Sequence, residues 1–125
     1  QVKAVIDLTE DKRGVDVAIE AVGLPQTWEK TIDMARKGGT VLLFGGPPGG
    51  TTVTIETQVL HYSQLTIKGV FNTTPRHVAA AFELLKQGVV KAEDFVGNEY
   101  RLEDVEKAIL NHKEGNVIKN VILYD

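Results

Sequence analysis

The sequence of 125 residues contains no cysteine and no apolar run near the length of a membrane helix. Without cysteine the chain has no disulfide and no thiolate metal site, and nothing indicates an oxidising compartment. A membrane-spanning helix needs about 20 consecutive apolar residues. The first ten residues, QVKAVIDLTE, also lack the pattern of a signal peptide. We therefore expect a globular protein in the cytoplasm.

Neither sign of charge dominates the sequence. The 14 lysines and arginines are interspersed with 17 aspartates and glutamates, which gives a net charge of −3. This composition provides no basic face for nucleic acid and no polybasic patch for a membrane surface, so we expect neither as a partner. The length and the apolar fraction of 42% suit a single hydrophobic core.

Motifs for metal binding, nucleophilic catalysis and nucleotide hydrolysis are missing. His61, His77 and His112 fall on separate predicted elements without ligand spacing, so we predict no metal site in this chain. No serine has the context of a nucleophile elbow. The glycines of FGGPPGG are not followed by the Lys-Ser or Lys-Thr pair of a Walker loop. We identify no catalytic residue.

The first 71 residues alternate between predicted helices and strands. In order, they are a helix from residue 2, a strand at 15–22, a helix from residue 25 to the glycines at 38 and 39, a strand at 40–44, a short helix at 57–63 and a strand at 65–71. Strands joined through a crossover helix run parallel. The strand at 15–22 is apolar on both alternations apart from Asp16 and Glu20, which predicts cover on both faces.

Residues 72–125 have a different pattern. They predict a helix from Thr74 to Gly88, a mixed connector at 89–101 that is extended in part, a helix at 103–112 and a final strand at 116–125. The predicted fold class is α/β.

The three predicted parallel strands end in loops at residues 21–23, 44–46 and 70–72, on one edge of the sheet. Ligands of open α/β sheets bind beyond the carboxyl ends of the strands. Glycine lets a ligand approach the main chain, and proline fixes the shape of a loop, as in FGGPPGG. A flat ring that carries an amide needs the backbone donors and acceptors of such an edge. The alternative is tight turns without a ligand, and for Glu20 we favour a loop cap over a ligand contact.

The order of GVDVAIEAVG, GGTVLLFGGPP, LTIKGVF and VIKNVIL resembles the C-terminal part of the zinc-dependent medium-chain alcohol dehydrogenases, especially the polyol and threonine dehydrogenase branch. The resemblance implies the second half of a Rossmann-type parallel sheet with flanking helices at residues 1–71. A helix-helix-strand segment at 72–125 would return to the catalytic domain. No G-x-G-x-x-G motif is present. The first residue is Gln rather than Met, and residues 2, 5, 6 and 9 repeat at helical spacing as if a helix were cut at its beginning, so we expect a piece of a longer parent protein.

The same resemblance implies a role for individual residues. Phe44 and Val70 would offer backbone carbonyls, and Asn72 its amide, to the nicotinamide carboxamide of NAD or NADP. Lys119 matches a basic position that reaches the pyrophosphate, with a solvated lysine as the alternative. Further loop residues would shape the ring's wall or border the riboses: Gly45, Gly46 and Pro47 for the wall, and Ala21, Val22 and Gly23 for the riboses.

The expected parent is an oxidoreductase that moves a hydride between a secondary alcohol or polyol and NAD(P). Zinc, bound only by the full-length parent, would polarise the alkoxide. This chain alone would be inactive. Two alternatives are a zinc-free quinone or enoyl reductase of the same fold and a non-enzymatic interaction module. In this family the LTIKGVF strand commonly pairs across a subunit interface, and the strand at 15–22 would lack a neighbour, so we expect a homo-oligomer.

Overall fold

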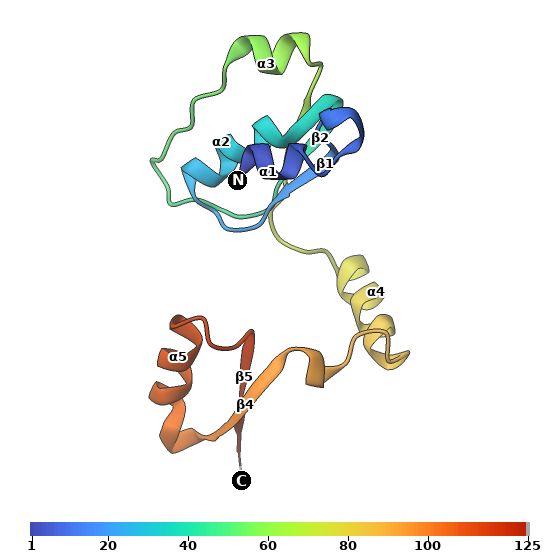
Figure 1. The fold of residues 1–125 in the computed structure, drawn as a ribbon. Helices are drawn as coiled ribbons and strands as arrows, with labels where there is room; N and C mark the ends of the chain where they lie inside the picture. The colour runs from blue at the N-terminus through green and yellow to red at the C-terminus, as the bar shows by residue number, and fades with distance from the viewer. Residues whose placement is uncertain (125) are drawn as a thin grey trace. The chain divides into compact units, whose positions relative to one another are not determined.

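The computed structural model describes residues 1–124, which form two compact units that divide between Asn72 and Thr73 (Figure 1). The elements of the first unit confirm the predicted alternation. They are α1 (Val2–Ile6), a 3-10 turn (Glu10–Lys12), β1 (Val15–Glu20), α2 (Pro25–Met34), β2 (Ala35–Leu43), α3 (Thr57–Tyr62) and β3 (Thr66–Gly69).

The three strands of this unit form one parallel sheet in the order β1-β2-β3. Its core is built from Ile32 on α2 and from Val41 and Leu43 on β2, all buried. The helix α2 contacts both β1 and β2, and α1 contacts α2. The parallel order places the ends of all three strands on one edge of the sheet, as predicted.

The other face of β1 is open, contrary to the prediction that both faces are covered. Val17 is 56% exposed and Ile19 is 62% exposed, whereas Ala18 and Glu20 are buried. Both faces of β1 carry apolar side chains, as the sequence indicates. Among the described residues, however, only one of these faces is covered, by α2.

The end of α2 also differs from the sequence prediction. The helix ends at Met34 rather than at the glycines 38 and 39, because Ala35 is already extended and pairs with Val15 of β1. The register then shifts so that Val17 pairs with Thr40. The residues between form an irregular insert in β2, where Arg36 bonds the Asp16 carboxylate at 2.5 Å.

The second unit contains one more strand than the expected helix-helix-strand segment. Its elements are α4 (Pro75–Lys86), a 3-10 turn (Ala92–Asp94), β4 (Val96–Arg101), a second such turn (Leu102–Asp104), α5 (Val105–Lys113) and β5 (Lys119–Leu123). Here β4 and β5 pair in parallel as a separate sheet, and α5 contacts both strands. Thr74 caps α4 by accepting a hydrogen bond from the His77 amide at 3.3 Å.

None of the helices within residues 1–124 has both the length and the apolar character that crossing a bilayer requires.

Candidate functional site

The loops after β1 and β2 meet backbone to backbone at the carboxyl edge of the first sheet. Gly23 is buried and has φ +84°, and a Cβ at this position would lie 2.8 Å from the Gly46 carbonyl oxygen. Only glycine allows this combination of dihedral angle and close approach. The sequence prediction that the two glycine-bearing loops share one edge is therefore confirmed, and the loops are also in contact.

Glu20, the last residue of β1, holds the first of these loops. Its side chain is 2% exposed and accepts hydrogen bonds from the backbone amides of Val22 and Gly23, each at 2.9 Å. The Thr27 hydroxyl donates to the same carboxylate at 2.6 Å. Glu20 is thus a loop cap, the interpretation that the sequence favoured.

The pKa of Glu20 lies below its ordinary value of 4.5. Burial by itself raises the pKa, but the hydrogen bonds from the Thr27 hydroxyl and from the Gly23 and Val22 amides together outweigh burial. The carboxylate is therefore ionised at neutral pH, and its charge is stabilised by these donors.

Gly45 lies directly against the first loop and Glu20. A Cβ on Gly45 would collide with the Gly23 backbone and would lie 2.6 Å from Oε2 of Glu20. The missing side chain thus makes room for the protein's own first loop. A Cβ on Gly46, in contrast, meets no atom within 4 Å. Of the two glycines, only Gly46 has open space at the position of a side chain.

Three backbone groups at this edge are free of hydrogen bonds within residues 1–124: the carbonyls of Phe44 and Val70 and the amide of Asn72. Phe44 and Val70 lie on neighbouring strand ends, because the Val70 amide donates to the Leu43 carbonyl at 3.1 Å. Asn72 has φ +63°, a left-handed conformation that asparagine tolerates better than most residues. Two acceptors and one donor are therefore available at the edge.

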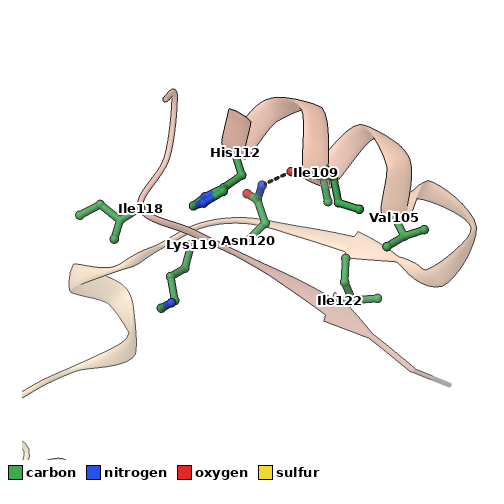
Figure 2. Close-up of a pocket in the computed structure, with 8 residues that line it drawn as sticks. Val105, Ile109, His112, Ile118, Lys119, Asn120 and Ile122 are labelled. Carbon is green, nitrogen blue, oxygen red and sulfur yellow. Dashed lines mark hydrogen bonds between the residues drawn. The ribbon is translucent and has the colours of Figure 1, made fainter. Parts of the chain in front are cut away.

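Lys119 lies in the second unit, at the first position of β5. Figure 2 shows its side chain pointing away from α5, whereas Asn120 points toward the helix. Within residues 1–124 the Lys119 ammonium makes no ion pair. Its role toward a pyrophosphate stays a prediction.

A hollow of about 290 Å³ between α5 and β5 was not foreseen from the sequence (Figure 2). Its walls are mainly apolar, with Val105, Ile109 and Ile122 among them. Asn120 donates to the Ala108 carbonyl at 2.7 Å, and its Oδ1 is buried without a partner in the described part of the chain. No sequence motif marks this hollow, because it forms between a helix and a strand that pack together only in the fold.

No group of three or more His, Cys, Asp and Glu side chains that could hold a metal ion occurs among residues 1–124. The three histidines lie on α3, α4 and α5. The sequence has no cysteine either, so the side chains that the structure describes do not form a zinc site.

The sequence of residues 1–87 matches the protein family described as zinc-binding dehydrogenase. The chain belongs to this family. This zinc-binding dehydrogenase chain is 30% identical over 105 residues to the sorbitol dehydrogenase of Bacillus subtilis, a match that covers 82% of the chain and 28% of that enzyme. It is 29% identical over 106 residues to D-arabinitol dehydrogenase 1 of Uromyces fabae, covering 82% of the chain and 29% of the relative.

Solved structures of the family share the fold. An alcohol dehydrogenase zinc-binding domain protein from Burkholderia ambifaria superposes on this chain with a TM-score of 0.85 and 27% identity. The match covers 99% of this chain and 34% of that protein. A zinc-binding dehydrogenase from Sinorhizobium meliloti 1021, solved bound to NADP, gives a TM-score of 0.85 and 27% identity, over 98% of this chain and 36% of that one. The predicted family and α/β fold class are confirmed. The dehydrogenase chain spans only about a third of the length of the curated relatives it matches, from 28% to 34%.

Proposed function

We propose that this chain forms the nicotinamide-side wall of the cofactor site in an NAD- or NADP-dependent dehydrogenase of secondary alcohols or polyols. One observation carries the proposal: the carbonyls of Phe44 and Val70 and the amide of Asn72, which have no hydrogen-bond partner within residues 1–124, occupy the carboxyl edge of a parallel sheet. The similarity to a sorbitol dehydrogenase and a D-arabinitol dehydrogenase supports a polyol as the substrate class.

The edge suits the carboxamide of a nicotinamide ring, which has two N–H donors and one carbonyl acceptor. The carbonyls of Phe44 and Val70 would accept from the carboxamide nitrogen, and the Asn72 amide would donate to the carboxamide oxygen. Because the Val70 amide is bonded to the Leu43 carbonyl at 3.1 Å, the two accepting strand ends keep a fixed spacing. They thereby orient the ring. The bound cofactor supplies the hydride acceptor.

Other residues of the chain contribute around this wall. Gly46 leaves open space beside the ring, and Pro47 helps to fix the loop. The backbone of Ala21, Val22 and Gly23 borders the riboses, and Lys119 supplies a cation for the pyrophosphate. Zinc is bound by a longer protein of which this chain is part, and that protein is a homo-oligomer in the cytoplasm. The chain of 125 residues by itself is inactive.

The test is a substrate-dependent assay of the full-length dehydrogenase that contains this chain. Purified protein is mixed with NAD or NADP and with sorbitol, xylitol or threonine, and reduced cofactor is followed by absorbance, with and without a chelator. We expect reduced cofactor with at least one polyol and a rise in melting temperature on addition of NADH. Reduction of quinones or enoyl compounds without alcohol oxidation would favour the reductase alternative. Absence of any stabilisation by either cofactor would favour an interaction module.

A further inference from the structure

Glu20 is a buried carboxylate that the proposed cofactor contacts leave unused. Its Oε1 accepts from the Val22 amide at 2.9 Å, from the Gly23 amide at 2.9 Å and from the Thr27 hydroxyl at 2.6 Å. Within residues 1–124 no lysine or arginine pairs with Glu20. Buried charges are retained where hydrogen bonds satisfy them, and here the donors belong to the loop after β1 and the start of α2.

The main chain of Glu20 holds the second loop. Its carbonyl oxygen accepts from the Phe44 amide at 2.9 Å and from the Gly45 amide at 3.0 Å. One residue therefore fastens the loop after β1 with its side chain and the loop after β2 with its backbone. A shift of Glu20 would move both loops together.

The contact with Gly45 makes this arrangement close-packed. Oε2 of Glu20 occupies the space that a Cβ on Gly45 would need. The Gly45 carbonyl in turn accepts from the Trp28 indole nitrogen at 2.9 Å. Glu20 is thus enclosed by the loop that it positions, and Phe44 directly precedes that contact.

We infer that Glu20 is a positioning residue for the nicotinamide wall. It fixes the position of the Phe44 carbonyl relative to the loop at residues 21–23. The inference rests on the proposed function. Glu20 touches no cofactor atom and acts through the backbone of the two loops. Its effect on catalysis comes from the orientation of the ring, since a small misplacement of reacting groups costs a large factor in rate.

The first test replaces Glu20 in the full-length dehydrogenase. Glu20→Met removes both acceptor oxygens at similar volume, and Glu20→Gln retains one. Glu10→Met and Glu10→Gln are matched controls at an exposed glutamate of the same unit. At a temperature where all proteins are folded, we expect kcat to fall by about 100-fold for Glu20→Met, with Glu20→Gln in between and the controls unchanged. The cofactor Kd rises in the same order, while the KM for the alcohol changes little.

A lower melting temperature with unchanged kcat and unchanged cofactor Kd would overturn the inference, because Glu20 would then only stabilise the fold. Removal of a buried carboxylate also destabilises the protein, so Thr27 provides a milder pair. Thr27→Val removes the hydroxyl that donates to Glu20, and Thr27→Ser keeps it. We expect Thr27→Val to lower kcat several-fold and Thr27→Ser to behave as the wild type. Equal kcat for the two variants would also contradict the inference.

A spectroscopic measurement on the chain of 125 residues separates this inference from the proposed function. Trp28 is the only tryptophan of the sequence, and its indole is bonded to the Gly45 carbonyl. We expect its emission maximum to shift to longer wavelength in Glu20→Met but not in Glu10→Met. If the full-length wild type binds no nicotinamide cofactor, the proposed function fails, and this shift still shows whether Glu20 holds the loops. An unshifted maximum in folded Glu20→Met would overturn the positioning role.

Discussion

The indole nitrogen of Trp28 donates a hydrogen bond of 2.9 Å to the carbonyl oxygen of Gly45. The bond joins α2, which covers the sheet, to the loop that follows β2 at the edge of the sheet. Of the two consecutive carbonyls in this loop, that of Gly45 is thereby engaged within the protein, and that of Phe44 is free within residues 1–124. The backbone therefore presents one defined acceptor at this point.

We predict that Trp28→Phe lowers the free energy of unfolding by about 1 kcal/mol, because it removes this hydrogen bond and keeps an aromatic ring in place. Urea unfolding followed by circular dichroism measures the change. Tyr62→Phe is the control, since Tyr62 is largely exposed and its hydroxyl has no partner among residues 1–124. Equal stability of Trp28→Phe and the wild type would show that the bond does not hold the loop.

The two glycines after Phe44 are expected to respond differently to valine. Gly45→Val places a side chain against the Gly23 backbone and the Glu20 carboxylate, so the melting temperature should fall by several degrees. Gly46→Val meets open space, so the melting temperature should stay close to that of the wild type. In the full-length dehydrogenase, Gly46→Val should weaken cofactor binding, because the new side chain would occupy the open space that we propose for the ring.

Gly49→Val is the matched control for this pair, because a Cβ at Gly49 also meets no atom within 4 Å but lies further along the loop. Thermal unfolding and cofactor titration are measured on all three variants. Normal cofactor affinity in Gly46→Val would remove Gly46 from the proposed wall. A stable Gly45→Val would contradict the close contact with Glu20.

The sequence allowed prediction of those features that depend on local pattern. Helical spacing located α2, α4 and α5. Apolar runs that end in a glycine-bearing loop located β1 and β2, and a run that ends in a polar turn located β3, together with the edge that the three strands share. The strand β4 was expected only as a partly extended connector, because VGNEYR lacks an apolar alternation. β4 forms a strand because it pairs with β5. The helix α5 separates the two strands in the sequence, so the local pattern of β4 does not predict this pairing.

The candidate site was predictable as a set of loops and not in its internal contacts. The roles of Phe44, Val70 and Asn72 came from the family resemblance, and their three free backbone groups suit those roles. The contact of Gly45 with Glu20 was not foreseen, because Glu20 lies on another strand and reaches Gly45 only through the parallel register. A glycine's neighbours in space cannot be read from its neighbours in sequence.

Asn72 should tolerate glycine and not alanine. Its φ of +63° is accessible to glycine without strain, whereas alanine costs about 1 kcal/mol in a left-handed conformation. We expect Asn72→Gly to retain both stability and cofactor affinity in the full-length protein, because the proposed contact uses only the backbone amide. Urea unfolding and cofactor titration of both variants check this. Loss of cofactor affinity in Asn72→Gly, with stability retained, would show that the asparagine side chain contacts the cofactor.

The contribution of Glu20 to stability should disappear in acid. Its pKa is lower in the folded chain than the ordinary value of 4.5, so the folded state favours the ionised form. The contribution is therefore fully present above about 4.5 and is lost as the pH falls through the lower pKa of the folded state. We expect the difference in unfolding free energy between the wild type and Glu20→Gln to be constant near neutral pH and to shrink below 4.5. A difference that grows in acid would mean that the folded pKa is raised.

The chain of 125 residues is expected to self-associate in solution. In the order β1-β2-β3 the outer edge of β1 has no partner strand among residues 1–124. Val17 and Ile19 add exposed apolar surface to the same strand. Unpaired strand edges with apolar side chains recruit other chains, and a lysine on such a strand suppresses this association.

Light scattering should therefore give a dimer or higher oligomer at tens of micromolar, and Ile19→Lys should raise the monomer fraction. Leu8→Lys is the control, since Leu8 is equally apolar and 88% exposed but lies outside the sheet. A wild-type chain that stays monomeric at this concentration would show that the open edge and face of β1 do not drive association.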